Sequence, residues 1–523
     1  MNFRLVLRLL GMVAWLIGGT MVFSLPWAHA ALHAEDVTLD RPAETAGALA
    51  LAGSIVICFL VGYLLRWIGR NDGGGLYRKE AMAVVGLSWV LATLLGALPF
   101  LFSGTERGRG VRMNIADCIF ESQSGFSTTG ATILTNIENP ELVARCILFW
   151  RSSTHFLGGL GIIVLFVAIL GQGSAGKALM RAEMPGPSKE GSQARMQHAA
   201  WTFAGLYCGL NAILALLLKF EGMTLFDALC HAFGTMATGG FSTYDASLGH
   251  FDNSWIESTV IVFMILAGTN FTLLYFLMTG KAGRLLRDVE WRTYISVIAG
   301  ITVLVVLMGL RHGNWPGPTW DSRLLSGIRY GFFQVVSIMT TTGYGTHDFD
   351  QWNHFGRGVL FMLMFVGGCA GSTGGGMKVI RHILFLKVIR LEVEKSFHPT
   401  VVRPLRLGGE PVDNPDLRYN ILTYFSLILT IFIFSWVLLV MWEPDTTWTS
   451  GNQPLDNKLI DSASCIAATL NNIGPGLGTI GASRNYAHFT SGSKLLFTWL
   501  MMLGRLEIFV ILVLCVPSFW RSR

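Results

Sequence analysis

Met339-Thr340-Thr341-Thr342-Gly343-Tyr344-Gly345-Thr346 is one of four stretches of the chain that share a pattern of small polar residues and glycine. The other three are Phe126-Ser127-Thr128-Thr129-Gly130-Ala131-Thr132, Met236-Ala237-Thr238-Gly239-Gly240-Phe241-Ser242 and Leu470-Asn471-Asn472-Ile473-Gly474-Pro475-Gly476. Each follows a short amphipathic stretch, and we place one glycine of each at an equivalent position: Gly130, Gly239, Gly343 and Gly474. An internal repeat of this kind predicts four copies of one structural unit.

The composition indicates that these units lie in a membrane. Of the 523 residues, 52% are hydrophobic and 14% are charged, whereas a soluble domain carries about 25% charged residues. Apolar segments long enough to cross a bilayer as helices recur along the chain. We predict ten of them, at 9–28, 47–68, 80–103, 142–170, 199–219, 255–279, 292–310, 356–390, 419–442 and 493–516.

The four repeated stretches lie between these segments and are too short or too rich in glycine to cross. They fall within 115–135, 225–243, 325–346 and 459–479, and we interpret them as re-entrant loops. The prediction is an all-α polytopic protein with four parallel membrane–pore-loop–membrane repeats around a pseudo-four-fold axis. An N-terminal helix pair occupies 1–74, and the four units occupy 75–176, 177–280, 281–395 and 396–523.

The distribution of charge predicts the orientation. With ten crossings and the N-terminus inside, most of the 39 basic residues fall in the inner loops and most of the 33 acidic residues outside, so both termini are expected in the cytoplasm. Ala28-His29-Ala30 imitates a signal-peptide cleavage site, but the preceding apolar run is as long as a membrane span, which favours an uncleaved helix. The eight cysteines are widely spaced, so neither a disulfide framework nor a structural zinc site is expected. We find no nucleophile–base set and no metal cluster in the sequence, so an enzyme is not expected.

The composition of the four loops suits a dehydrated monovalent cation. Backbone carbonyls can replace the water shell of K⁺ without placing a full charge in the path, and glycine permits the left-handed backbone that such loops need. The residues predicted to form the filter are Thr128, Thr129, Gly130, Ala131, Ala237, Thr238, Gly239, Gly240, Thr341, Thr342, Gly343, Tyr344, Asn472, Ile473, Gly474 and Pro475. The alternative is that the loops only pack helices closely, as small residues do in membranes.

A second glycine-rich stretch interrupts the long apolar segment 356–390. Residues 367–376 cannot favour a regular helix, because each glycine costs about 1 kcal/mol relative to alanine. Arg505 lies within the last apolar segment, where a charge is a functional hypothesis by default, although it could instead snorkel or pair with Glu507. Lys378, at the end of the glycine-rich stretch, could have a functional role there or be an ordinary lysine at the membrane boundary. His155 is interpreted as a packing or interfacial residue.

The chain resembles the Trk/Ktr/HKT superfamily of potassium transporters. The resemblance rests on the stretches at 124–132, 340–346, 368–378, 471–478 and 502–507 and covers roughly 75–516. It implies a K⁺ pathway of the bacterial cytoplasmic membrane, usually in a homodimer, with Rb⁺ and Na⁺ as further candidate ions. It also implies a gate formed by Gly371, Ser372, Thr373, Gly374, Gly375, Gly376, Lys378 and Arg505.

The same resemblance implies a cytoplasmic regulatory subunit that binds NAD or ATP and docks on the basic stretch 378–418 and the other inner loops. This chain then needs no covalently bound cofactor and no nucleic acid. Three alternatives remain open at this point. One is a symporter that couples K⁺ to H⁺ or Na⁺, another is a less selective Na⁺/K⁺ pathway, and the third is a membrane scaffold or receptor without ion flux.

Overall fold

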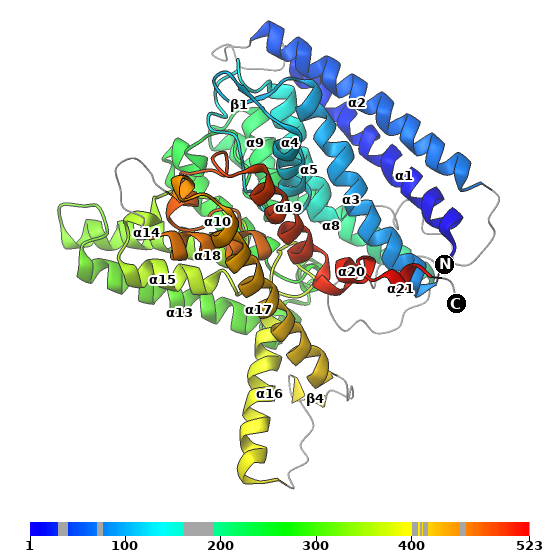
Figure 1. Ribbon diagram of the computed structural model, residues 1–523. Helices are drawn as coiled ribbons and strands as arrows, with labels where there is room; N and C mark the ends of the chain where they lie inside the picture. The colour runs from blue at the N-terminus through cyan, green and yellow to red at the C-terminus, as the bar shows by residue number, and fades with distance from the viewer. Residues whose placement is uncertain are drawn as a thin grey trace.

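The computed structural model describes residues 1–29, 40–70, 77–161, 193–399, 406–407, 410–411, 417–448 and 457–521. These residues form a bundle of helices with two short antiparallel strand pairs (Figure 1). The pairs are β1 (Glu106–Gly108) with β2 (Val111–Arg112), and β3 (Arg406–Leu407) with β4 (Glu410–Pro411).

Six helices of the described part are long and apolar enough to span a bilayer. They are α1 (Phe3–Met21, continued by η1, Val22–Ala28), α2 (Arg41–Ile68), α3 (Arg78–Phe102), α8 (Gln193–Phe220), α13 (Val289–His312) and α17 (Leu417–Trp442). Large apolar side chains such as Phe434 and Met441 on α17 are exposed, which suits a surface that faces lipid. The helical membrane fold is as expected, whereas the number of ten spans stays a prediction.

α1 and α2 pack side by side along one edge of the bundle, next to α3 (Figure 1). Their contact is close because glycines face the partner helix. A Cβ on Gly62 would clash with the indole of Trp15, and one on Gly18 would meet Cys58 Cβ at 2.8 Å. Small residues that let helix backbones approach are typical of packing in membranes.

Four shorter helices precede the four repeated loops. They are α4 (Ile115–Phe126), α9 (Leu225–Met236), α14 (Trp320–Met339) and α18 (Lys458–Leu470). Side-chain caps set three of their starts: Asn114 accepts from the backbone N–H of Asp117, Thr224 from that of Asp227, and Thr319 from that of Ser322. Nearly every residue of α4 and α18 is buried, so these helices are enclosed by protein.

Two of the apolar segments that follow the loops are not continuous helices, and whether each crosses the membrane stays a prediction. The segment 255–279 is not one helix but α10 (Ser254–Ala267) and α11 (Phe271–Met278), bent by 110°. Asn270 causes the restart, because its side chain caps α11 by accepting from the N–H of Thr272. The segment 493–516 is likewise α19 (Ser491–Arg505) and α20 (Glu507–Leu514), with Leu506 between them.

The other two segments are consistent with the sequence as far as the structure describes them. α5 (Arg145–Leu160) ends at Gly161, whose φ of 78° is left-handed, and the rest of the predicted segment 142–170 lies outside the described residues. The expected glycine-rich break is present between α15 (His354–Leu363) and α16 (Val379–Phe397). α16 projects away from the body of the protein, beside the start of α17 (Figure 1).

The remaining described elements are short. They are η3 (Ser247–Phe251), α12 (Ala282–Arg287), η4 (Phe349–Gln351), η5 (Asp445–Trp448), η7 (Gly478–Ile480) and α21 (Pro517–Trp520).

Candidate ion filter and gate

All four short helices end in the same backbone motif. The residue after the C-cap has a left-handed conformation although it is not glycine: Thr128 (φ 52°), Thr238 (54°), Thr341 (59°) and Asn472 (55°). We call the stretches around these residues loop 1 (127–131), loop 2 (237–241), loop 3 (340–344) and loop 4 (471–475). A left-handed residue other than glycine costs roughly 1–2 kcal/mol. Backbone strain of this kind clusters at functional sites, so its repetition at four equivalent positions indicates a functional site.

The hydrogen bonds of the motif are also repeated. In loop 3, the N–H of Thr341 donates to Ile338 O at 3.0 Å and that of Thr342 donates to Ser337 O at 2.9 Å. Loops 1, 2 and 4 make the same two bonds at the same offsets. This is a Schellman motif, which satisfies carbonyls at the end of each helix and turns the chain sharply.

A glycine with positive φ stands two residues after each left-handed residue. These glycines are Gly130 (φ 79°), Gly240 (76°), Gly343 (80°) and Gly474 (94°). The predicted equivalence of Gly239 with the other three is therefore wrong, and Gly240 takes that place. The sequence offers two adjacent glycines in loop 2, and only the position of Thr238 fixes which of them turns the backbone.

Each of these glycines lies against a carbonyl of the next loop. A Cβ on Gly130 would clash with Gly239 O, one on Gly240 with Thr342 O, and one on Gly343 with Ile473 O. A Cβ on Gly474 would meet Thr129 O at 2.5 Å, so loop 4 lies against loop 1 and the four loops form a closed ring. The four predicted filter stretches thus lie together in a closed order, and each contributes the carbonyl that follows its left-handed residue.

Side chains behind the loops hold this arrangement. Tyr344, predicted as a filter residue, is fully buried, and its hydroxyl donates to His231 O of α9 at 3.2 Å and to Phe241 O of loop 2 at 3.4 Å. Asn472 Nδ2 donates to Thr129 Oγ1 at 2.9 Å and joins loops 4 and 1. The Tyr486 hydroxyl donates to Gly474 O at 2.7 Å. Tyr486 was not predicted, because a lone tyrosine between two helices gives no signal in the sequence.

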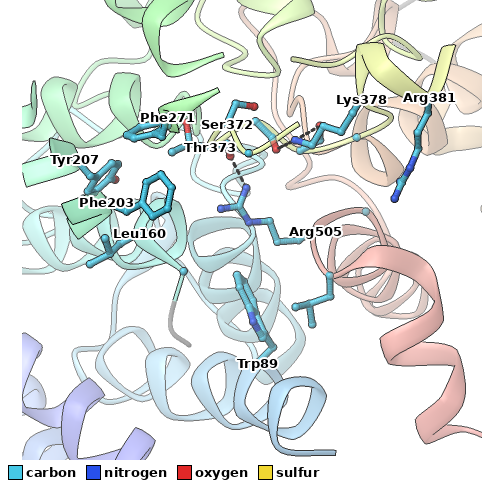
Figure 2. Close-up of a pocket in the computed structure, with 18 of the residues that line it drawn as sticks. Trp89, Leu160, Phe203, Tyr207, Phe271, Ser372, Thr373, Lys378, Arg381 and Arg505 are labelled. Carbon is cyan, nitrogen blue, oxygen red and sulfur yellow. Dashed lines mark hydrogen bonds between the residues drawn. The ribbon is translucent and has the colours of Figure 1, made fainter. Parts of the chain in front are cut away.

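Arg505 contacts the glycine-rich loop, which we define as residues 364–378. Its Nη1 donates to Thr373 O at 2.5 Å (Figure 2). Its Nη2 donates to Gly158 O at 2.6 Å. Because α19 ends at Arg505, the guanidinium extends from a helix terminus rather than from the side of a continuous span. The predicted residues Thr373 and Arg505 are therefore in direct contact.

The glycine-rich loop is tied to several neighbours. Phe271 N donates to Gly371 O at 3.0 Å, and Cys369 N donates to Gly268 O at 2.8 Å. Lys378 is 5% exposed, and its ammonium donates to Gly374 O. Lys378 thus points into the protein, and its interpretation as an ordinary boundary lysine is wrong.

A cavity of about 120 Å³ lies beside this loop. Its lining combines Gly371–Gly376 and Arg505 with the apolar side chains of Leu160, Phe203 and Phe271 (Figure 2). The cavity is bounded by the loop on one side and by the ends of interrupted helices on the other.

A multi-pass helical membrane protein with four helix–loop elements is the class that this fold and site define. The chain belongs to the TrkH family, because the family model described as a cation transport protein matches residues 49–522. It is 36% identical over 525 residues to the Trk system potassium uptake protein TrkH of Salmonella typhimurium, with all of both chains covered. It is 29% identical over 522 residues to TrkG of Escherichia coli, with 99% of each covered.

A solved structure is similar over the whole chain. The crystal structure of the potassium transporter TrkH from Vibrio parahaemolyticus matches with a TM-score of 0.83 at 30% identity, covering 100% of both chains. The superfamily resemblance expected from the sequence is therefore confirmed at the level of the TrkH family.

Proposed function

We propose that this chain carries K⁺ across the bacterial cytoplasmic membrane through the four loops. The observation that carries the proposal is the closed order of the loops, in which Thr129, Gly239, Thr342 and Ile473 each place a carbonyl against the glycine of the preceding loop. Stacked carbonyls can replace the hydration shell of K⁺. Each short helix also ends at its loop, so the partly negative end of its dipole favours a cation there.

The glycine-rich loop is the gate of this pathway. Arg505 holds it through Thr373 O, and Lys378 holds it through Gly374 O. Release of these bonds would let a chain segment without helical structure move with little steric cost. A positive guanidinium close to the ion path also opposes the passage of cations, so its displacement would favour conduction in two ways.

Regulation is proposed to come from a cytoplasmic subunit that binds NAD or ATP, with both termini of this chain on the same side and two copies of the chain in the assembly. α16 projects from the body and carries basic residues such as Lys387 and Arg390, which provides a surface for such a subunit. K⁺ is the transported ion in this proposal, and the nucleotide binds only the partner.

The test is ⁸⁶Rb⁺ uptake into liposomes that contain the purified chain, with and without the regulatory subunit, in competition with K⁺ or Na⁺. The proposal predicts uptake that K⁺ blocks and Na⁺ does not. Uptake that requires an imposed H⁺ or Na⁺ gradient would indicate a symporter instead. No uptake under either condition would contradict the proposal and return the loops to a packing role.

A further inference from the structure

A buried ion pair lies behind loops 1 and 2. Arg151 of α5 and Glu121 of α4 approach to 2.6 Å between Nε and Oε1, and their side chains are 2% and 0% exposed. Burying two charges is costly unless their remaining hydrogen-bonding groups are also satisfied. The partners of these groups therefore indicate what the pair is for.

Both members of the pair bind the residues that directly follow the loops. Glu121 accepts from Thr132 Oγ1 at 2.8 Å and from Ile133 N at 3.0 Å, directly after loop 1. Arg151 Nη1 donates to Ser242 O at 3.0 Å, directly after loop 2. The ion pair therefore connects the chain segments that follow two adjacent loops.

His155 makes a second connection one helical turn further along α5. Its Nε2 accepts from the N–H of Phe241 at 3.1 Å, so the ring proton is on Nδ1, which donates to Gly125 O at 2.8 Å. The Phe241 ring contacts both side chains, with its centroid 3.4 Å from Arg151 Cζ and 4.1 Å from the imidazole centroid. Arg151, His155 and Glu121 thus form one cluster across the boundary of loops 1 and 2.

The other three units have apolar residues at the positions of Arg151 and His155. We align the second helices on Leu157-Gly158-Gly159, Leu266-Ala267-Gly268, Val366-Gly367-Gly368 and Leu503-Gly504-Arg505. The positions of Arg151 and His155 are then occupied by the buried residues Val260 and Met264, Leu360 and Met364, and Phe497 and Met501. The unit folds with apolar side chains at these two positions, so Arg151 and His155 are special to the first unit. The position of Glu121, seven residues before the left-handed residue, is also polar in the second and third units, at His231 and Gln334.

We propose that Glu121, Arg151 and His155 are positioning residues that fix loops 1 and 2 relative to each other and thereby set the preference for K⁺ over Na⁺. This rests on the proposed filter function. Gly130 lies against Gly239 O at this boundary, so a shift of loop 2 relative to loop 1 displaces a filter carbonyl. Selectivity depends on the number and placement of such carbonyls, although none of the three side chains touches the ion.

The test compares ⁸⁶Rb⁺ uptake, and its inhibition by K⁺ and by Na⁺, in the wild type and in two variants. The double variant Arg151→Met with Glu121→Gln removes both charges together, and His155→Leu removes the second connection. We expect Na⁺ to become about tenfold more effective relative to K⁺ in both variants. His155→Gln keeps a donor and an acceptor, and we expect it to retain the wild-type ratio.

The matched control is Asp117→Asn with Lys494→Met. This pair is also buried, with 2.6 Å between Lys494 Nζ and Asp117 Oδ1, and Asp117 belongs to the same helix α4. Lys494 also donates to Ala487 O, which lies outside the four loops. We expect the control to lower the temperature of unfolding and leave the K⁺/Na⁺ ratio unchanged.

A wild-type ratio in either folded variant would overturn the proposal. If neither variant yields folded protein, the cluster serves folding and the proposal is likewise overturned. Absence of ⁸⁶Rb⁺ uptake by the wild type, with and without the regulatory subunit, would instead contradict the proposed function, so the two failures are distinguishable.

Discussion

The backbone N–H of Gly375 donates to the hydroxyl oxygen of Thr341 at 2.9 Å, so the glycine-rich loop is bonded directly to loop 3. Thr341 is the left-handed residue of that loop, with a φ of 59°. A Cβ on Gly375 would also approach Asn472 Cβ to 2.6 Å, which places the same glycine against loop 4. The candidate gate and the candidate filter are therefore in contact, and a change in one is expected to affect the other.

Thr341→Val tests this contact, because it keeps the branched shape and removes the hydroxyl. Loss of one buried hydrogen bond costs about 1 kcal/mol. We expect the closed state to weaken by that amount, so ⁸⁶Rb⁺ uptake without the regulatory subunit should rise severalfold. Thr341→Ser retains the hydroxyl and should behave as the wild type. Equal basal uptake by Thr341→Val and Thr341→Ser would show that the bond does not hold the gate.

Arg505→Gln tests the guanidinium. The substitution removes the positive charge and at least one of the two bonds, to Thr373 O and to Gly158 O. Charge-assisted hydrogen bonds contribute roughly 1.5–3 kcal/mol, so basal uptake is expected to rise about tenfold or more. Arg505→Lys keeps the charge without the planar fork and should give an intermediate rate. A lower basal rate in folded Arg505→Gln would contradict the assignment of Arg505 to the gate.

Asp350, which lies against Gly478 beyond loop 4, provides a prediction about pH. Its carboxylate accepts from Gly478 N at 2.9 Å and lies 3.8 Å from Arg357 Nε, and burial raises its pKa above the ordinary value. A raised carboxyl pKa means that the folded protein binds the proton more tightly than the unfolded chain does. The folded state therefore gains stability as the pH falls through the raised pKa toward about 4.

Asp350→Asn keeps an acceptor for Gly478 and does not titrate. The unfolding temperature of the wild type minus that of this variant should therefore increase as the pH is lowered from 7 toward 4.5. The measurement is thermal unfolding of both purified proteins at several pH values. Parallel curves would show that Asp350 has an unshifted pKa.

Much of the fold could be predicted because its signals are local. Runs of apolar residues locate the long helices, and the repeated Thr-Gly patterns locate the loops. The bend at Gly268–Asn270 could not be found in this way, since the residues on both sides are equally apolar and hydropathy does not register a change of direction. The choice between Gly239 and Gly240 depended on backbone geometry that either glycine allows.

The partners of the charged residues were the least predictable part of the site. Arg505 was singled out because it is charged within an apolar segment, but its bonds to Thr373 and Gly158 join positions far apart in the sequence. Glu121 and Arg151 lie in segments that contain other polar residues, so neither stood out. Only the fold reveals that they are fully enclosed and face each other.

The most direct test of the central claim compares Gly343→Ala with Gly345→Ala. A Cβ on Gly343 would clash with Ile473 O at a φ of 80°, whereas the nearest atom to a Cβ on Gly345 is Ala482 Cβ at 3.5 Å. We predict that Gly343→Ala abolishes K⁺-sensitive ⁸⁶Rb⁺ uptake or makes it sensitive to Na⁺, while Gly345→Ala retains the wild-type rate and selectivity. Wild-type selectivity in folded Gly343→Ala would contradict the assignment of these loops as the filter.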